Sequence, residues 1–305
     1  MTDILQKYFQ AWINADIETV KDILNKNTIP FEILFVDDGS SDATYSKIVE
    51  LSTTNQEVRG ISFSRNFGKE SAIFAGLENA AGACCVIMDC DLQHPPQKIV
   101  EMYRLWEQGY EVVEGVKTDR GKESALYRWC ANTFYSIISK LIKIDMSNAS
   151  DFKLMDRKVI DVLKEMPERN VFFRALSSWV GFKKTTVSFE VQERTAGVSK
   201  WSSWSLIKYA VSNITSFSAA PMQLVTVLGV LFGIFAVVLG VQSLVHKITG
   251  RALEGFTTVI IVQLLVGSIV MICMGITGYY ISKIYEEIKG RPRYIISTEV
   301  NAEEE

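Results

Sequence analysis

Cysteine is scarce in this sequence, and its pattern excludes several classes of protein. The 305 residues include five cysteines, which are Cys84, Cys85, Cys90, Cys130 and Cys273. Their number is odd and their spacing matches no metal-ligand pattern, so we expect no disulfide framework and a reducing cytosol. The N-terminus also lacks a basic region followed by an apolar one. We therefore expect no signal peptide and a large domain that stays in the compartment where it is synthesised.

Charged residues are absent from two long segments of the C-terminal third, Met222–Val245 and Phe256–Ser282. At about 1.5 Å rise per residue, a helix over either segment would cross the roughly 30 Å hydrocarbon core of a bilayer. The chain has a mean hydropathy of +0.13 although 22% of its residues are charged, so the apolar excess is local. This pattern argues against a purely soluble protein and a polytopic transporter, and it predicts a soluble domain on a two-helix transmembrane hairpin. Two helices of a soluble core are the weaker alternative.

Basic residues flank this hairpin unevenly. Those before or after it are Lys200, Lys208, Lys283, Lys289, Arg291 and Arg293, whereas the connecting loop has only Lys247 and Arg251. Because basic residues favour the cytoplasmic side, we expect both termini there, in a multi-pass protein of the inner (cytoplasmic) membrane. Two segments rich in apolar, aromatic and basic residues, Leu126–Lys143 and Trp201–Phe217, are typical of helices in the membrane interface. Ordinary packing helices are the alternative for both.

Short apolar runs alternate with helical patterns in the first two thirds of the chain. We expect strands at Phe31–Val36, Gly60–Ser64, Cys84–Met88 and Glu111–Val116, and helices at Ala43–Leu51, Ser71–Ala80 and Pro96–Gln108. This alternation predicts an α/β fold with a doubly wound, mostly parallel sheet. In such sheets ligands bind outside the carboxyl ends of the strands. Both acidic clusters of the sequence lie at such ends.

The first of these clusters to consider contains Asp89, Asp91 and Gln93. Residues two apart on an extended chain point to the same side, so these three side chains can converge. Carboxylate and amide oxygens suit Mg²⁺ or Mn²⁺ that also binds a diphosphate. Two aspartates at this spacing also occur by chance in many loops, but the position directly after a buried strand favours the metal site.

The other acidic cluster and two basic clusters have both a structural and a functional interpretation. Asp37 or Asp38 could accept hydrogen bonds from a ribose or a base, or could belong to a turn before a helix. Basic and hydroxyl residues that could bind phosphate oxygens or lipid head groups follow the strands or precede the membrane. They are Lys69, Arg120, Arg128, Arg194, Ser199 and Lys200.

Six ordered motifs together resemble one enzyme family. The strings FVDDGSSDAT, SRNFGKESAIFAGL, MDCDLQHPP, GVKTDRGKES, SDFKLMDRKV and QERTAGVSKW, followed by a hairpin, resemble the polyisoprenyl-phosphate glycosyltransferases. These are family 2 enzymes of the GT-A fold, related to dolichol-phosphate mannose synthases, and the sequence is most similar to bacterial bactoprenol glucosyltransferases. The resemblance implies transfer of a sugar from a nucleotide sugar, UDP-glucose, to undecaprenyl phosphate. It leaves room for a homo-oligomer and implies no nucleic-acid partner.

The resemblance also assigns roles to residues. Asp89, Asp91 and Gln93 match the motif that binds Mg²⁺ or Mn²⁺ and the diphosphate, and Asp37 and Asp38 match the nucleotide end of the site. The phosphate-handling set is Arg120, Arg128, Arg194, Ser199 and Lys200. Asp91 and Asp151 correspond to catalytic carboxylates, although Asp151 could instead position the acceptor or the sugar hydroxyls. A phosphate monoester with a second pKa near 6 is already a competent nucleophile at neutral pH.

One family feature is absent. The family begins with a strand that carries a V-P-x-Y-N-E-like motif, and no such motif precedes Phe31, although Ile17–Leu24 is typical of the helix that follows that strand. The chain is thus expected to comprise an atypical segment (1–30), a GT-A domain (31–200), an interfacial helix (201–221), the hairpin (222–282) and a cytoplasmic tail (283–305). The absent motif keeps two alternatives open. These are another nucleotide-sugar donor and a non-catalytic, membrane-bound nucleotide-sugar binder.

Overall fold

The structure is a computed structural model that describes residues 17–90, 94–118, 150–166, 168, 172–190, 220–250 and 255–301. The chain divides into two compact units. The N-terminal unit comprises Met1–Leu206 together with Pro292–Glu305, and the hairpin unit comprises Ile207–Arg291. The two segments expected in the membrane interface, Leu126–Lys143 and Trp201–Phe217, lie outside the described residues.

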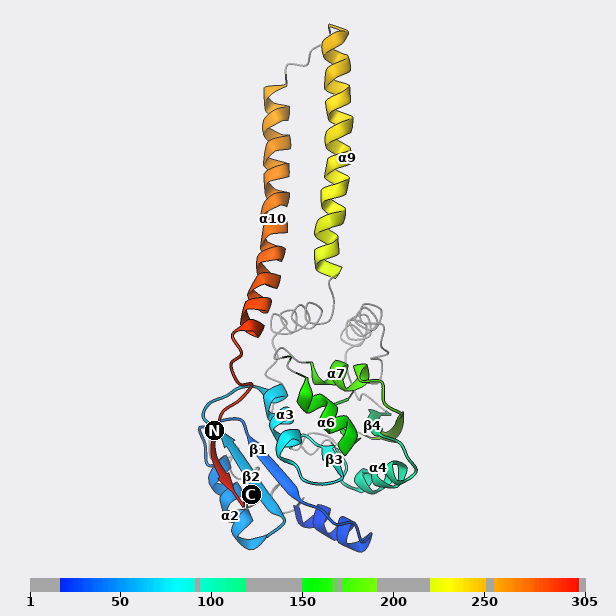
Figure 1. The fold of residues 1–305 in the computed structure, drawn as a ribbon, viewed down its shortest axis with the longest axis vertical. Helices are drawn as coiled ribbons and strands as arrows, with labels where there is room; N and C mark the ends of the chain where they lie inside the picture. The colour runs from blue at the N-terminus through cyan, green and yellow to red at the C-terminus, as the bar shows by residue number, and fades with distance from the viewer. Residues whose placement is uncertain are drawn as a thin grey trace. The chain divides into compact units, whose positions relative to one another are not determined.

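The first sheet of the N-terminal unit has three strands (Figure 1). β1 (Ile33–Asp37) pairs in parallel with β2 (Val58–Phe63), and β7 (Ile296–Val300) pairs antiparallel with the other edge of β2. α2 (Thr44–Thr54) connects β1 to β2, and α3 (Lys69–Asn79) follows β2. Apolar runs predicted these two strands and helical patterns predicted the two helices, and the structure confirms all four with small shifts at their ends.

The second sheet has four strands in the order β3-β5-β4-β6. They are β3 (Cys84–Ile87), β5 (Lys153–Asp156), β4 (Val112–Lys117) and β6 (Lys184–Phe189). β5 lies antiparallel between β3 and β4, whereas β6 is parallel to β4. The α/β class is therefore confirmed, but the sheets are mixed where the sequence predicted mostly parallel strands. The reason is that β5 and β7 enter from distant parts of the chain and run against their neighbours.

Three helices accompany the second sheet. α4 (Gln97–Glu107) connects β3 to β4, α6 (Arg157–Glu165) follows β5 directly, and α7 (Phe173–Trp179) precedes β6. The sequence predicted α4 from its helical spacing. α6 begins at a conventional cap, because the Asp156 carboxylate accepts a hydrogen bond from the backbone N–H of Lys158 at 2.9 Å. The antiparallel pairing of β3 with β5 places the residues that follow β3 and those that precede β5 at one edge of the sheet.

β1 and β3 are the inner edges of the two sheets. In the described part of the chain, each pairs along one side only and no strand joins them. Ile33–Val36 and Cys84–Ile87 are apolar, yet they are only half-buried, whereas most of β2 and β4 is buried. Inner strands of an α/β sheet are ordinarily covered on both faces. The described strands therefore form two separate sheets where the sequence predicted a single one.

The residues before β1 pack onto the fold. Residues 17–26 are helical, which confirms the helix expected at Ile17–Leu24. Ile17 is buried against Ile33 and Phe35 of β1. Val20 and Leu24 contribute to a second buried cluster that includes side chains of α4. This segment therefore belongs to the same hydrophobic core as the sheet, although the sequence analysis set it apart as atypical.

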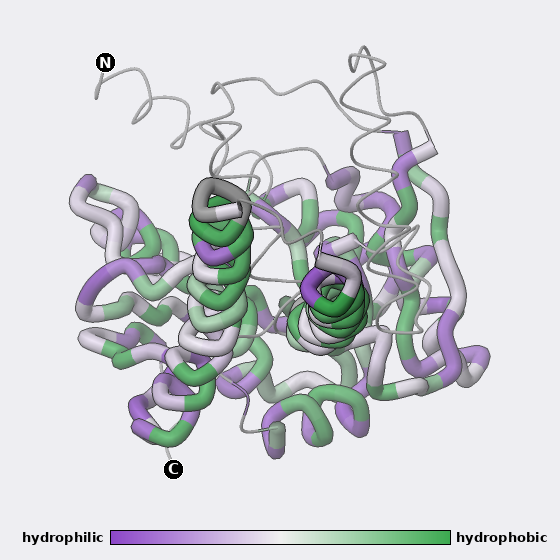
Figure 2. Tube along the Cα trace, turned by 90° about the horizontal axis from the view of Figure 1, so that it is seen from above, coloured by the Kyte–Doolittle hydropathy of each residue, from purple (hydrophilic) through white to green (hydrophobic). Residues whose placement is uncertain are grey.

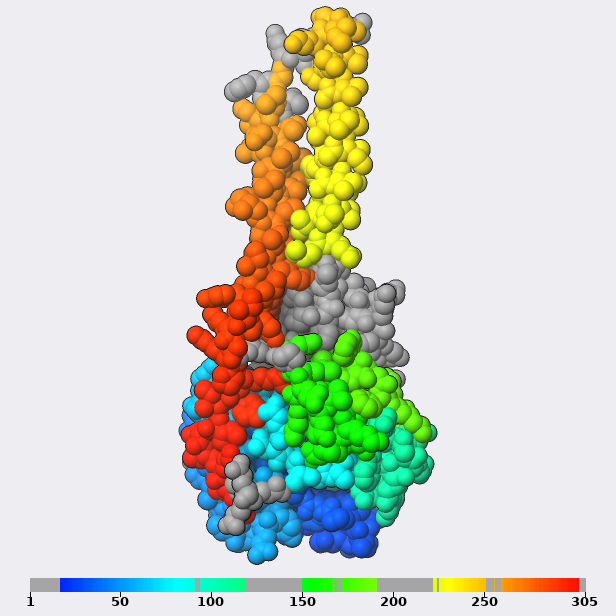
Figure 3. Space-filling model, viewed as in Figure 1, coloured from blue at the N-terminus to red at the C-terminus, as the bar shows by residue number. Residues whose placement is uncertain are grey.

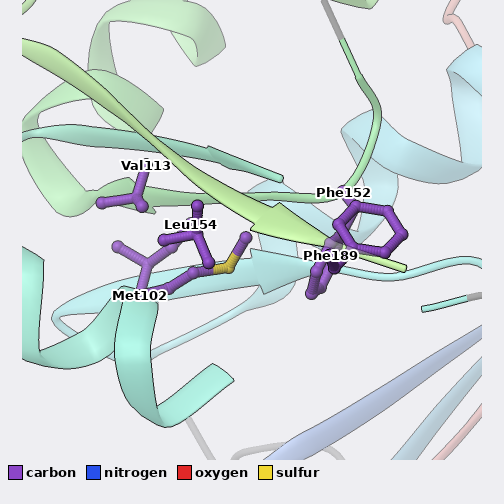
Figure 4. Close-up of a cluster of buried hydrophobic side chains, with 6 residues drawn as sticks. Met102, Val113, Phe152, Leu154 and Phe189 are labelled. Carbon is purple, nitrogen blue, oxygen red and sulfur yellow. The ribbon is translucent and has the colours of Figure 1, made fainter. Parts of the chain in front are cut away.

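The core of the second sheet is a cluster of large apolar side chains (Figure 4). It consists of Met102, Val113, Phe152, Leu154, Val187 and Phe189, all buried. The phenyl rings of Phe152 and Phe189 meet edge to face with their centroids 5.4 Å apart, a favoured geometry for aromatic pairs. Because Phe152 directly follows Asp151, this packing fixes the backbone at a predicted site residue.

The segment after the hairpin returns to the N-terminal unit (red in Figure 3). Besides forming β7, it stacks the Tyr294 ring on Phe63 at 5.0 Å between centroids. The side-chain amide of Asn301 donates to the carbonyl oxygens of Ser52 and Val58. Residues 292–301 are therefore an integral part of this unit, whereas the sequence analysis described 283–305 simply as a cytoplasmic tail.

The hairpin unit consists of two long apolar helices, α9 (Ala220–Ile248) and α10 (Phe256–Ile288). Their segments Val225–Ile248 and Val259–Ile288 are long and apolar enough to cross a membrane, and neither is buried inside the protein. Seen from above in Figure 2, the traces of both helices are coloured mainly as hydrophobic. Helices of a soluble core would be buried, so the exposure of these two favours the membrane interpretation. α10 continues beyond the expected end of the hairpin at Ser282.

Candidate active site

Four charged side chains from separate elements meet beside the carboxyl end of β3. Asp89 lies just after this strand, and Lys69 is the first residue of α3. Asp151 lies just before β5, whose first residue, Lys153, pairs with the last residue of β3. Arg174 is on α7. The antiparallel insertion of β5 is what brings Asp151 to the same edge as Asp89.

The ammonium group of Lys69 joins two of the predicted carboxylates. Its Nζ lies 2.6 Å from Oδ2 of Asp89 and 2.8 Å from Oδ2 of Asp151. Partial burial would lower the pKa of Lys69, but the charges of Asp151 and Asp89 outweigh burial and raise it. Three residues that the sequence singled out separately are thus brought into direct contact.

Arg174 completes the cluster through a two-point contact with Asp151. Its Nε donates to Oδ1 and its Nη2 donates to Oδ2 of the carboxylate, both at 2.7 Å. Burial alone would raise the pKa of Asp151, but the hydrogen bonds and charge of Arg174, with the charge of Lys69, hold it well below its usual range. Sequence reasoning missed Arg174, because nothing in the segment around it suggests a partner 23 residues earlier in the chain.

Two further polar contacts hold α7 beside this cluster. The Glu70 carboxylate accepts a hydrogen bond from the backbone N–H of Phe173 at 2.9 Å, at the start of α7. Burial raises the pKa of Glu70 to about 7. Deeper in the unit, the Lys153 ammonium contacts Glu114 at 3.0 Å and Ser177 at 2.7 Å. Burial lowers the pKa of Lys153, against the opposing effect of Glu114.

The two aspartates that follow β1 form hydrogen bonds within the protein. Asp37 is buried, and its carboxylate accepts from the backbone N–H of Ser40 and from the Ser62 hydroxyl. The Asp38 carboxylate accepts from the backbone N–H groups of Phe67 and Gly68, just before α3. Asp37 thus stabilises the turn after β1, as the structural interpretation predicted, whereas Asp38 binds the distant loop that precedes α3. Their contact with a nucleotide stays a prediction.

Comparison with known proteins gives matches along nearly the whole chain. A model described as glycosyl transferase family 2 matches residues 17–163. An uncharacterized glycosyltransferase of Bacillus subtilis strain 168, YkcC, is 38% identical over 286 residues, covering 93% of this chain and 88% of the relative. The bactoprenol glucosyl transferase of Shigella phage SfII is 36% identical over 282 residues, covering 92% of this chain and 91% of the relative. A prophage bactoprenol glucosyl transferase homolog of Escherichia coli strain K12 is 38% identical over 282 residues, covering 92% of both.

The chain belongs to glycosyl transferase family 2. It is a glycosyltransferase, as the six motifs predicted. The family model begins at residue 17, where the described helix begins to contribute to the core. The family 2 region thus includes the helix before Phe31 that the sequence analysis excluded from the GT-A domain.

His94 contacts Asp89 of this site, and the sequence analysis did not single it out as a site residue. Its ring is buried and stacks on Phe152 at 4.7 Å between centroids, with an angle of 11° between the planes. Its Nδ1 accepts a hydrogen bond from the backbone N–H of Asp89 at 3.4 Å. The core cluster thereby holds the first residue of the predicted metal motif.

Most of the remaining predicted site residues lie outside the described part of the chain. They are Asp91, Gln93, Arg120, Arg128, Arg194, Ser199 and Lys200. Among the residues that the structure describes, no three His, Cys, Asp or Glu side chains converge as metal ligands. Asp89 is the described member of the predicted metal set. Its side chain is 33% exposed, and carboxylate oxygens suit Mg²⁺ or Mn²⁺, so the chemistry of Asp89 fits the predicted metal.

Proposed function

We propose that this family 2 glycosyltransferase transfers glucose from UDP-glucose to undecaprenyl phosphate at a membrane. The observation that carries the proposal is the contact of Lys69 with Asp89 and Asp151 beside the end of β3. This arrangement provides both a carboxylate for a divalent cation and positive charge for a diphosphate. Two relatives that are 36% and 38% identical over nearly all of this chain are named bactoprenol glucosyl transferase or a homolog of it. Their names support the choice of acceptor and sugar.

The proposed reaction is a single inverting displacement. An oxygen of the lipid phosphate forms a bond to the anomeric carbon while the bond from that carbon to the donor diphosphate breaks, and UDP leaves with the bonding electrons. The acceptor monoester has a second pKa near 6, so at neutral pH it attacks largely as the dianion. When bound, Mg²⁺ or Mn²⁺ held by Asp89, Asp91 and Gln93 would supply Lewis-acid stabilisation of the leaving diphosphate.

The protein's own cationic side chains would also stabilise the negative charge that develops on the leaving diphosphate. Lys69 lies at the open side of the cluster, with 48% of its side chain exposed. Its ammonium can donate to a phosphate oxygen as negative charge develops on the leaving group. Nothing in this step needs a proton acceptor on the protein, since the attacking group is already ionised.

Membrane attachment would place the acceptor within reach. In the proposal, α9 and α10 cross the inner membrane with both termini in the cytoplasm, which follows from the flanking basic residues. The phosphate of the lipid would be bound by a set of residues near the membrane boundary, which are Arg120, Arg128, Arg194, Ser199 and Lys200. A water-soluble donor and a membrane-bound acceptor could then meet at one site.

Transfer of labelled glucose to undecaprenyl phosphate by the full chain in lipid nanodiscs tests this proposal. We expect transfer with Mg²⁺ or Mn²⁺ and its loss, by at least about 100-fold, in Asp89→Ala and Asp91→Ala. Asp161→Ala is the matched control, because Asp161 is an exposed aspartate of α6. Wild-type turnover in Asp91→Ala would contradict the metal assignment.

Two further measurements separate the alternatives. A panel of UDP- and GDP-sugars identifies the donor, and glucose transfer slower than that of another sugar would contradict UDP-glucose. The anomeric configuration of the product, read by NMR, distinguishes inversion from retention. Binding of UDP-glucose without any product at saturating lipid and metal would instead identify a non-catalytic nucleotide-sugar binder.

A further inference from the structure

Asp151 is the most enclosed member of the charged cluster. Both of its carboxylate oxygens accept hydrogen bonds from cations. Oδ1 accepts from Arg174, and Oδ2 accepts from both Arg174 and Lys69 at 2.7 and 2.8 Å. A carboxylate that is to remove a proton from a substrate needs an oxygen that the substrate can reach. Here three donors from two cations already occupy the oxygens.

The exposed fractions of the side chains in the cluster also argue against Asp151 as a proton acceptor. The Asp151 side chain is only 9% exposed, whereas the side chain of Arg174 is 29% exposed and that of Lys69 is 48% exposed. The carboxylate thus lies beneath the two cations. A ligand that enters from solvent meets an ammonium and a guanidinium group before it meets the carboxylate.

Further contacts of α7 act together with Asp151 to hold Arg174 in this position. Phe173, the residue before it, donates its backbone N–H to Glu70, and Ser177, one turn later on α7, binds the buried Lys153 ammonium. Lys153 is the first residue of β5 and lies two residues after Asp151, so α7 is attached to this segment at two alternate positions. A guanidinium group supported in this way is preorganised, and it offers the fixed donor geometry that suits phosphate oxygens.

We infer that Asp151 is a positioning residue that holds Lys69 and Arg174 at the open side of the site, where they bind phosphate oxygens. Arg174 is thereby a further substrate-binding residue. The inference rests on the proposed function for the source of the phosphate, which is either the nucleoside diphosphate or the lipid phosphate. The low pKa of the Asp151 carboxyl agrees with it, because protonation would cost two charged contacts.

Equilibrium binding by the full chain in nanodiscs tests the inference with two probes, UDP with Mg²⁺ and a short-chain polyisoprenyl phosphate. We expect Arg174→Gln to weaken binding of at least one probe by about 10- to 100-fold, which is the effect of losing a charge-assisted hydrogen bond. Arg174→Lys should recover part of the affinity. The probe that is affected identifies the source of the phosphate. Arg104→Gln, an exposed arginine paired with Glu107 on α4, should bind both probes as the wild type does.

Asp151→Asn separates positioning from proton transfer. We expect it to weaken binding of the same probe by about tenfold or more and to raise KM, while kcat falls less than about tenfold. Unchanged affinity with a kcat lowered about 1000-fold would instead identify Asp151 as a proton acceptor and overturn the inference. Wild-type affinities in Arg174→Gln, or no binding of either probe to the wild type, would also overturn it. Failure of glucose transfer alone contradicts the proposed function and leaves the binding results to decide this inference.

Discussion

Replacing Lys153 with methionine should lower the free energy of unfolding of the N-terminal unit by about 3–5 kcal/mol. The side chain of Lys153 is fully buried and that of Glu114 is 4% exposed, with 3.0 Å between Nζ and Oε1. Methionine fills the space of the aliphatic stem but leaves the Glu114 carboxylate buried without its cation. The Ser177 hydroxyl also loses the hydrogen bond that it accepts from Lys153 at 2.7 Å. Urea unfolding of the full chain in detergent, followed by tryptophan fluorescence, measures the change.

Two comparisons make this prediction refutable. Glu114→Leu combined with Lys153→Met should recover most of the loss, because an apolar pair needs no compensating charge. Lys98→Met removes the cation of a solvent-exposed pair with Glu101 on α4, 2.7 Å apart, and should cost less than about 1 kcal/mol. If Lys153→Met lowers the free energy of unfolding no more than Lys98→Met does, the idea that the Lys153 ammonium compensates the buried charge of Glu114 is refuted.

Three other changes test separate features by the same unfolding measurement. Gly39→Ala should lower the free energy of unfolding by about 3 kcal/mol or more, because φ is +65° and the new Cβ would lie 2.4 Å from the carbonyl carbon of Arg65. Gly109→Ala is the control: φ is +88° there but the space is open, so the loss should be about 1 kcal/mol. Tyr294→Ala should cost about 2–4 kcal/mol through the lost ring stacking; no loss would mean that β7 docks without it. Glu70 has its pKa raised from 4.5 to about 7, so its contribution to stability is present below pH 4.5 and is lost as the pH rises through 7. Glu70→Gln should therefore gain up to about 3 kcal/mol relative to the wild type between pH 4.5 and 8, and a pH-independent difference would refute this.

The elements that the sequence predicted are those whose signals are local. Phe31–Val36 and Cys84–Met88 are apolar runs that end at acidic turn residues, and the structure has β1 and β3 there. Helical spacing was sufficient for α2, α3 and α4. The two uncharged segments were sufficient for α9 and α10, because twenty or more apolar residues leave few alternatives to a membrane helix.

The elements that the sequence did not predict depend on distant partners. β7 is a short, largely exposed strand, and it exists because β2 offers it an edge, with Ile61 opposite Glu299. β5 has only four residues, and its antiparallel position between β3 and β4 leaves no periodic signal that separates it from a parallel strand. Pairings across so much intervening chain are decided by tertiary contacts rather than by local propensity.

The same distinction applies to the site. Asp89, Asp151 and Lys69 were identifiable because strand ends and motifs mark them individually. The sequence did not reveal that Lys69 contacts both carboxylates, nor that Arg174 covers Asp151, because both facts depend on where β5 and α7 lie. A family motif indicates which residues matter, but the hydrogen-bond partners decide whether a carboxylate can accept a proton.

α3 connects the site to the part of the chain beyond the hairpin. Its first residue, Lys69, contacts the site carboxylates, and the opposite end of the helix is held by the C-terminal segment. Glu78 accepts a hydrogen bond from the Tyr294 hydroxyl and lies 3.7 Å from the guanidinium group of Arg293. That guanidinium group also lies 4.3 Å from the centre of the buried Phe74 ring. The helix that supplies the site's ammonium group is therefore held at its other end by residues that follow both apolar helices, so the N-terminal unit is stabilised by chain from both sides of the hairpin.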